Sequence, residues 1–354
     1  MLSAITFFIL LSILVLIHEF GHYYVAKKSG MLVEEFGFGL PPRIYGIKVG
    51  ETLYSLNLLP FGGFVKIFGE SPDDLKSKKI SPDLKKRAFN NKPWKQRAAV
   101  LLAGPAMNFV LAVIVISYMF TQGVYLPSDT VRIVGVDKNS PAAIAGLQKK
   151  DIIVSIDGKP VTSSNDVIKT AQQKAGKEAV IEYERNGQTY HTVIIPRKNP
   201  PQGQGAVGVV ITDLEYKSYP FYLAPFIGVW ESIKISLQFY QELGKLIFQL
   251  VTFQKPQVQV AGPVGIAKLT SDAVKTGFTA VLQLLGLLSL NLALINLIPF
   301  PALDGGQLVF VLYEGTTRRK INENFKAKVN AIGFAVLIFL LLFITFKDIR
   351  GLIK

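Results

Sequence analysis

Four long apolar runs constrain this chain of 354 residues more than any other feature of its sequence. A helix that crosses a bilayer needs about 20 consecutive and mostly apolar residues. Runs of roughly that length cover residues 2–26, 98–120, 278–300 and 331–346. Since 49% of all residues are hydrophobic, we predict a multi-pass α-helical membrane protein with about four transmembrane helices. The first run lacks a basic start and a small-residue cleavage site, so it is expected to stay in the mature protein.

The distribution of basic residues predicts the orientation of these helices. Residues 27–97 contain 14 Lys and Arg against 7 Asp and Glu, whereas residues 121–276 contain 17 against 13. Loops rich in Lys and Arg stay in the cytoplasm. We therefore expect 27–97 inside, with 121–276 and both termini outside. The net charge of +14 is attributed to this topology, and no nucleic-acid partner is expected.

Changes in composition along the chain define seven expected segments. They are a first transmembrane helix (1–27), a cytoplasmic loop (28–97), a second transmembrane helix (98–121), a soluble domain (129–213), an amphipathic interfacial segment (214–276), a third transmembrane helix (277–310) and a fourth transmembrane helix (329–347). The lipid bilayer is thus an expected partner of most of the chain.

The cytoplasmic loop contains a stretch that is predicted to form strands. Residues 37–70 are rich in Gly, aromatic and β-prone residues. We expect a membrane-associated β-hairpin over Thr52–Ile67 that turns at Pro60–Gly63. It is too apolar for a solvated loop, so it either dips into the membrane under a cover of protein or water or lies flat on the membrane face. The basic connector 71–97 is expected to meet anionic lipid headgroups.

Residues 129–213 are predicted to form a small extracytoplasmic α+β domain. Short β-prone runs such as VRIVGV and AVIEYERNG alternate with turns and one helical segment, NDVIKTAQQKA. The following residues 218–253 place Glu and Lys at near-helical spacing among apolar residues. This pattern favours an interfacial amphipathic helix over a fifth transmembrane span.

The motif His18-Glu19-Phe20-Gly21-His22 lies at the end of the first apolar run. On a helix, side chains four residues apart project from the same face and can bind one metal ion. The chain has no cysteine and only three histidines, so two of them at this spacing indicate a metal site rather than a polar patch at a helix end. Metal binding would also offset the cost of an ionisable side chain in a membrane helix, which is about 2.5–3.5 kcal/mol near the centre.

A catalytic zinc ion takes three protein ligands and keeps one position open. His191 is the remaining histidine, but it is predicted to lie on a strand of the external domain. Asp304 is the better candidate, because the third apolar run should end at the depth of His22 and an Asp among apolar residues is costly unless paired. The alternative is that Asp304-Gly305-Gly306 forms an ordinary turn after a helix.

These residues resemble the motifs of the site-2 protease family of intramembrane zinc metalloproteases, most closely its bacterial regulator of sigma-E protease branch. HEFGH at 18–22 resembles the family's zinc motif, and AGPAMN at 103–108 resembles its second-span motif. NLIPFPALDGG at 296–306 resembles its Asn-x-x-Pro-x-x-x-Leu-Asp-Gly motif. GPVGIAK at 262–268 is also similar to that branch. The sequence NSPAAIAGLQKKDIIVSIDGKPV resembles the PDZ family, and 129–213 has room for one such domain where the best-known enterobacterial members carry two.

The expected activity is that of a metalloendopeptidase with Zn²⁺ as cofactor. His18, His22 and Asp304 would bind the ion, which lowers the pKa of its water from about 15.7 toward about 7. Glu19 would act as general base toward that water and then as general acid toward the leaving amine. The resemblance gives Asn296 a role in holding the substrate backbone or the oxyanion, and Asn291 is a further candidate for that role.

A substrate helix must unwind before it is cut, because its carbonyl groups are hydrogen-bonded. We expect a strand edge near Gly62 and Gly63 to hold the unwound segment by strand addition. The resemblance implies substrates that are single-pass membrane proteins of the anti-sigma-factor type, with remnant signal peptides as a further class, trimmed beforehand by a site-1-type protease. It also implies a bacterial inner or plasma membrane, with the active site near the cytoplasmic face.

An inactive membrane scaffold, a metal transporter and a peptide-binding adaptor are the alternative interpretations. The presence of Glu19 between both motif histidines, together with Asp304, argues against a scaffold. A transporter is expected to carry internal repeats or paired broken helices, and we find neither in the sequence. An adaptor would account for 129–213 but leave HEFGH unexplained, so an intramembrane protease is favoured.

Overall fold

The computed structural model describes residues 1–70, 81–254 and 261–353. These residues divide into two units. The first contains Met1–Thr121 and Pro220–Lys354, and the second is Gln122–Tyr219. Residues 71–80 of the predicted cytoplasmic loop and 255–260 of the predicted interfacial segment lie outside the described residues.

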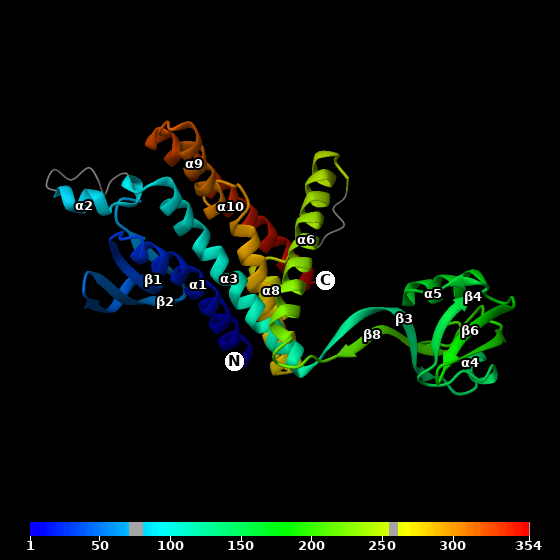
Figure 1. Ribbon diagram of the computed structural model, residues 1–354. Helices are drawn as coiled ribbons and strands as arrows, with labels where there is room; N and C mark the ends of the chain where they lie inside the picture. The colour runs from blue at the N-terminus through cyan, green and yellow to red at the C-terminus, as the bar shows by residue number, and fades with distance from the viewer. Residues whose placement is uncertain (71–80, 255–260, 354) are drawn as a thin grey trace. The chain divides into compact units, whose positions relative to one another are not determined.

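Four helices among the described residues have the length and composition of membrane spans, in agreement with the predicted number (Figure 1). They are α1 (Leu2–Lys28), α3 (Trp94–Gln122), α8 (Phe278–Asn296) and α10 (Glu323–Ile353). Only 6% of the most apolar stretch of α10 is buried within the protein, against 44% for α3. Exposed apolar surface of this extent is stable in lipid rather than in water.

The third predicted span, 277–310, is wrong in one respect, because it consists of two helices. A short irregular segment separates α8 from α9 (Asp304–Thr317). Pro299 and Pro301 account for the break, since proline lacks the N–H that a helix needs and restricts the residue before it. As a result, the Asp of the Leu-Asp-Gly sequence is the first residue of a new helix, where a carboxylate is favoured by the helix dipole.

The predicted hairpin turn at Pro60–Gly63 is wrong. The hairpin consists of β1 (Val33–Val49) and β2 (Thr52–Ile67), which pair antiparallel and are joined at Gly50 and Glu51. Gly50 has a φ of 63°, a left-handed conformation that glycine adopts without strain. The stretch that was predicted to be the turn is instead a bend within β2.

Because both strands bend, the hairpin folds over into a sheet of four segments. Residues 33–38 pair with 53–56 on one side and with 63–67 on the other, and residues 43–49 pair with 52–57. The segment 63–67 is therefore one edge of the sheet. β2 also contacts α1, so this edge is brought beside the helix that carries HEFGH.

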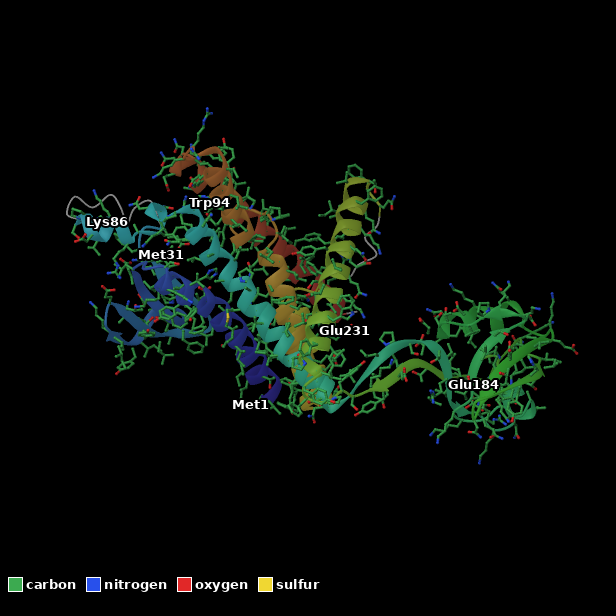
Figure 2. The ribbon with its side chains drawn as sticks, viewed as in Figure 1. Met1, Met31, Lys86, Trp94, Glu184 and Glu231 are labelled. Carbon is green, nitrogen blue, oxygen red and sulfur yellow. The ribbon has the colours of Figure 1, made fainter. Side chains whose placement is uncertain are left out.

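A buried cluster fixes the base of the hairpin to α1 and α3. Met31 and Val33 are 1% and 0% exposed, and Trp94 at the start of α3 packs against the cluster (Figure 2). Before α3 the chain forms the short helix α2 (Pro82–Arg87) and a 3₁₀ turn over Phe89–Asn91. Burial of each large apolar side chain stabilises such a contact by about 1.5–3 kcal/mol.

The predicted interfacial segment contains two helices, α6 (Ala224–Val251) and α7 (Pro263–Thr276). The N–H groups of Gly262 and Gly265 donate to the carboxylate of Asp348 on α10, at 2.9 and 2.8 Å. The N-terminus of a helix has unpaired N–H groups and favours negative charge. The GPVG sequence thus forms the capped start of α7, and its cap ties α7 to α10.

The second unit is a small α+β domain built on one antiparallel sheet. Its strands lie in the order β7-β6-β4-β3-β8, with β5 paired to β4. The elements are β3 (Val124–Val136), α4 (Pro141–Ile144), β4 (Ile152–Ile156), β5 (Lys159–Pro160), α5 (Ser164–Gln173), β6 (Ala179–Arg185), β7 (Gln188–Ile194) and β8 (Val209–Lys217). Apolar residues such as Val131, Ile153 and Ile181 form its core. β8 lies at an edge of the sheet.

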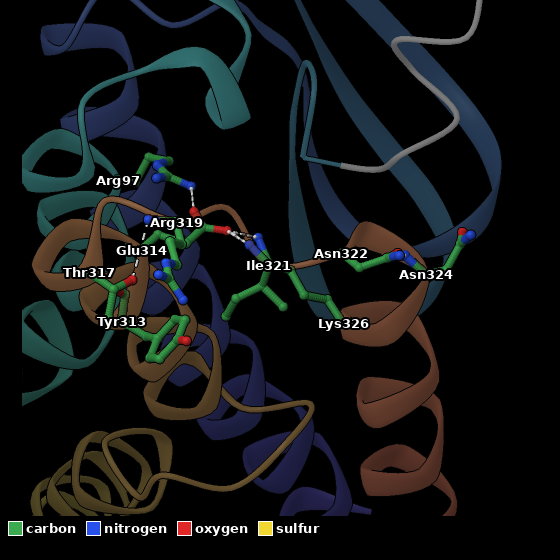
Figure 3. Close-up of polar contacts among 9 residues, drawn as sticks. All are labelled: Arg97, Tyr313, Glu314, Thr317, Arg319, Ile321, Asn322, Asn324 and Lys326. Atoms are coloured by element: carbon green, nitrogen blue, oxygen red, sulfur yellow. Dashed lines mark hydrogen bonds and ion pairs between the residues drawn. The ribbon is translucent and has the colours of Figure 1, made fainter.

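Charged side chains from α3, α9 and α10 meet in the interior of the first unit (Figure 3). Glu314 accepts a hydrogen bond from Arg97 Nη1 at 2.8 Å and pairs with Lys326 Nζ at 2.6 Å. It also accepts from the N–H of Ile321 at 3.1 Å. Burial by itself raises the pKa of the Glu314 carboxyl, but these donors outweigh burial, and the pKa is lowered from its ordinary value.

We predict that Glu314→Gln lowers the free energy of unfolding by about 3–5 kcal/mol, because it leaves the buried Arg97 and the half-buried Lys326 without a counter-charge. Since the folded-state pKa is lowered, the stabilisation is present above the unfolded-state pKa of about 4.3 and is lost as the pH falls through the folded-state value. Thermal unfolding in detergent at several pH values measures both effects. Glu242→Gln, which breaks an exposed pair with Lys245, is the control and should change stability by less than about 1 kcal/mol. Equal losses in the two variants would contradict this prediction.

Candidate metal centre

The two motif histidines project from one face of α1. His18 and His22 are 8% and 7% exposed, and their Nε2 atoms lie 3.1 Å apart. A separation of four residues is about one helical turn, so the two rings lie one above the other. Two imidazoles are thus buried together in a helix that is otherwise almost entirely apolar.

Asp304 at the start of α9 lies beside both rings. Its Oδ2 atom is 3.1 Å from His18 Nε2 and 3.4 Å from His22 Nε2. The same Oδ2 atom is buried and has no hydrogen-bond partner among the described residues. A buried carboxylate oxygen without a partner is costly, and a bound cation would remove that cost.

These three atoms fit a zinc ion. Zinc binds His nitrogen and carboxylate oxygen at about 2.0–2.2 Å, and tetrahedral geometry then separates two ligand atoms by about 3.3 Å. The separations here, from 3.1 to 3.4 Å, agree with that value. Two imidazoles and one carboxylate leave one of four positions open, which is the pattern of catalytic rather than structural zinc sites.

The other ring nitrogens have partners on α3. His22 Nδ1 lies 2.8 Å from the carbonyl oxygen of Val100, so this nitrogen carries the proton and Nε2 keeps a free lone pair. His18 Nδ1 lies 3.3 Å from the amide of Asn108, which is fully buried. Amide oxygen and nitrogen are assigned from their surroundings. A His18 that binds metal through Nε2 carries its proton on Nδ1, so Asn108 must present its oxygen there.

Close packing of α1 on α3 depends on two glycines. A Cβ atom at Gly104 would overlap Nε2 of His22, and one at Gly21 would overlap the carbonyl oxygen of Ala103. A side chain at either position would push the two helices apart. These glycines let the α3 backbone approach the histidines closely enough to hold their rings.

Glu19 follows His18 and is rotated from it by about 100° around the helix axis. Its Oε2 atom accepts a hydrogen bond from the N–H of Val65 at 3.1 Å. Glu19 and the three candidate ligands line a cavity of about 260 Å³, together with Phe64 and Val65 of β2 and Glu70. A carboxylate thus lies beside the candidate metal position without belonging to the ligand set.

A second and smaller cavity adjoins the first. It measures about 90 Å³ and shares Glu70, Phe89 and Leu101 with the metal-site cavity, while Gln307 and Asn330 are among its other walls. Cavities with polar walls of this size suit water. The candidate metal centre therefore borders a space that can supply water for hydrolysis.

The remaining predicted site residues lie less close to the metal position. Gly63 borders α1, because a Cβ atom at this position would be 3.8 Å from Cγ of Glu19. Gly62 lies in the bend of β2 and has a φ of 87°. Asn291 and Asn296 are half-buried on α8 and are not among the described residues that line the 260 Å³ cavity. His191, which was set aside, lies exposed on β7.

Sequence reasoning missed several contributors to this site, among them Asn108, Gly104 and the backbone groups of Val65 and Val100. Asn108 and Gly104 lie in the AGPAMN sequence, whose resemblance to a family motif was noted without a role for either residue. The N–H of Val65 could not be recognised from the sequence, because every residue except proline has a backbone N–H and the residue type does not mark this one. A polar Asn within an apolar span was the signal that could have identified Asn108.

Comparison with known proteins places the chain in a family. The model of peptidase family M50 matches residues 6–340. This chain belongs to peptidase family M50, the site-2 protease family. Its relatives include a zinc metalloprotease RasP of Shouchella clausii, 31% identical with 99% of each chain covered. A putative zinc metalloprotease of Clostridium perfringens is 34% identical with 96% of each chain covered. The regulator of sigma-W protease RasP of Bacillus subtilis is 29% identical with 99% of each chain covered.

Among solved structures, this M50 member is similar to the PDZ domain of an SdrC-like protein from Listeria monocytogenes. The two are 26% identical, with 25% of this chain and 95% of that chain covered, at a TM-score of 0.22. A PDZ domain of an SdrC-like protein from Listeria innocua gives 26% identity and a TM-score of 0.21.

We predict that Asn108→Ala weakens zinc binding by about 10- to 100-fold, because His18 loses the partner that orients its ring. Asn108→Asp keeps an oxygen acceptor at the same place and should retain most of the affinity. Competition with a chelator of known affinity measures the effect in purified protein. Ser117→Ala removes another buried polar side chain of α3, whose hydroxyl bonds within the helix, and is the control. A loss in Ser117→Ala as large as in Asn108→Ala would contradict the role of Asn108.

Proposed function

We propose that this zinc metalloprotease is an intramembrane endopeptidase that cuts peptide bonds within the transmembrane segments of single-pass membrane proteins. The observation that carries the proposal is the convergence of His18, His22 and Asp304 beside Glu19, where the two histidines and Glu19 belong to α1, a helix with the composition of a membrane span. A soluble protease would have no reason to bury its metal ligands in such helices. Substrates that lie in the bilayer can reach a site of this kind.

The three ligands and Glu19 have separate roles in this proposal. His18, His22 and Asp304 would hold the zinc ion, which would supply Lewis acidity and lower the pKa of a water molecule toward neutrality. Glu19 takes a proton from the attacking water and returns it to the leaving amine. Val100 and Asn108 keep both histidines in the tautomer that presents Nε2 to the metal.

The edge of the hairpin sheet is the proposed holder of the unwound substrate. Segment 63–67 is an edge that borders the metal-site cavity through Phe64 and Val65. An extended peptide can add to such an edge through backbone hydrogen bonds, with little dependence on its sequence. A substrate held in this way has its carbonyl groups freed from helical hydrogen bonds and open to attack. Asn296 and Asn291 are proposed to contact its backbone or the oxyanion.

The second unit is proposed to be a PDZ-like module that binds an extended peptide. A groove of about 510 Å³ lies between α5 and β8, lined by Val167 and Ala171 on the helix and by Val209 and Ile211 on the strand. β8 is an edge of the sheet, so a peptide in this groove can pair with it.

Family membership and the sequence support a finer biological assignment, which is part of this proposal. A relative is named regulator of sigma-W protease, which supports anti-sigma-type membrane substrates and, by extension, remnant signal peptides. The charge distribution supports extracytoplasmic termini and a metal centre near the cytoplasmic face of a bacterial inner or plasma membrane. An upstream site-1-type protease is expected to remove the external part of the substrate first.

Glu19→Gln tests the proposed chemistry. We expect the variant to keep about one zinc ion per chain and to lose at least 10³-fold in cleavage, because the amide cannot take a proton from water. The measurement is cleavage of a single-pass substrate in detergent, together with the zinc content of both proteins. Cleavage by the variant at the rate of the unchanged protein would refute the role of Glu19. A zinc-loaded unchanged protein that cuts none of a panel of such substrates would favour an inactive scaffold.

The strand edge is tested at Gly63, whose φ does not require glycine. Gly63→Leu places a side chain between β2 and α1, where the added Cβ atom would lie 3.0 Å from the carbonyl oxygen of Gly37 on β1 and 3.5 Å from Cδ2 of Leu16 on α1. We predict an increase in KM of about tenfold, as roughly 1.4 kcal/mol of substrate binding is lost. Gly50→Asn at the far end of the hairpin has open space around it and is the control. Unchanged cleavage by Gly63→Leu would remove the strand-addition step from the proposal.

A further inference from the structure

The hydrogen bond between Val65 and Glu19 connects the hairpin sheet to the proposed general base. Segment 63–67 pairs with 33–38 on one side, and Val65 has Phe36 as its partner in that register. The N–H of Val65 does not serve this pairing, because it donates to Oε2 of Glu19 at 3.1 Å. In an antiparallel edge strand, N–H groups point alternately toward the neighbouring strand and away from it. Val65 carries one that points away, toward α1.

The bond restricts a side chain that would otherwise have considerable freedom. Glu19 has three side-chain torsions, and its position on α1 fixes only its Cα and Cβ atoms. A hydrogen bond from a backbone N–H to a carboxylate is charge-assisted and stronger than one between neutral groups. Anchoring of Oε2 leaves the second carboxylate oxygen available for a proton. The backbone of β2 is itself held by its pairing with β1, so the donor is well fixed.

We infer that the main-chain N–H of Val65 is a positioning group for catalysis, which holds the Glu19 carboxylate in the orientation it needs to take a proton from the attacking water. The inference rests on the proposed function, in that Glu19 is the base. It gives the hairpin a second role besides the proposed holding of substrate. A substrate strand at this edge then pairs through neighbouring groups and leaves the N–H of Val65 with Glu19.

Val65→Pro removes this N–H and little else. Proline is tolerated in edge strands where its nitrogen faces away from the ladder, as it does here. Val65→Ala is the matched control, because it also shortens the side chain but keeps the N–H. A third variant replaces Val65 by its α-hydroxy acid, so that an ester oxygen stands in place of the N–H without a change of side chain. The ester variant decides the matter if the proline variant does not fold.

The measurements are kcat and KM for a single-pass membrane substrate in detergent, with the zinc content of each variant. We expect the proline and ester variants to keep one zinc ion and a KM within about threefold of Val65→Ala. Their kcat should be about 10- to 100-fold lower, the size of effect that small misplacements of reacting groups produce. A kcat equal to that of Val65→Ala would overturn the inference.

Two other outcomes would also count against it. A rise in KM with unchanged kcat would assign the N–H of Val65 to substrate pairing instead of to Glu19. Loss of zinc would show that the bond maintains the metal site rather than the base. Glu19→Gln separates failure of this inference from failure of the proposed function. If Glu19→Gln remains active, Glu19 is not the general base, whatever the Val65 variants show.

Discussion

The structure of the first unit depends on the meeting of a half-buried carboxylate, whose Oδ2 atom is buried, with two buried imidazoles. Oδ2 of Asp304 lies within 3.4 Å of both His18 and His22 Nε2 atoms, and it has no other hydrogen-bond partner among the described residues. Three polar groups in a membrane-like interior are costly unless a cation joins them. A zinc ion held by these three groups, as proposed, would stabilise the contact between α1 and the start of α9 and would create the reactive centre at the same place.

Backbone geometry brings the three groups together. Two prolines break the third apolar run, so that Asp304 begins a helix beside the histidines instead of continuing one past them. Gly104 lets α3 approach the rings, and the Val100 carbonyl fixes one of them from the same helix. The folded-over hairpin adds a strand edge against α1, so the proposed substrate-holding edge and the N–H that bonds to Glu19 belong to one element.

The membrane spans and most of the candidate metal ligands could be predicted from the sequence. The hairpin turn and the backbone contacts of the site could not, for physical reasons. Four spans follow from apolar length, and the pair His18 and His22 follows from helical spacing, because both depend on local pattern. The choice of Asp304 over His191 needed the order of the helices as well. The hairpin turn was misplaced because Pro60–Gly63 carries strong turn residues, whereas the actual turn is the two-residue loop Gly50–Glu51 between the consecutive strands β1 and β2. Contacts such as Val65 to Glu19 depend on a backbone group and have no signature in residue types.

The central claim is that two imidazoles and one carboxylate of this chain bind one zinc ion. Zinc K-edge X-ray absorption on the purified protein tests it most directly, because the spectrum reports the number and kind of ligand atoms. We expect one zinc per chain with two imidazole nitrogens and oxygen ligands at about 2.0–2.2 Å. We also expect that Asp304→Asn changes the oxygen shell and leaves the imidazole signal in place. A zinc site with one imidazole or none, or a spectrum that Asp304→Asn leaves unaltered, would contradict the account.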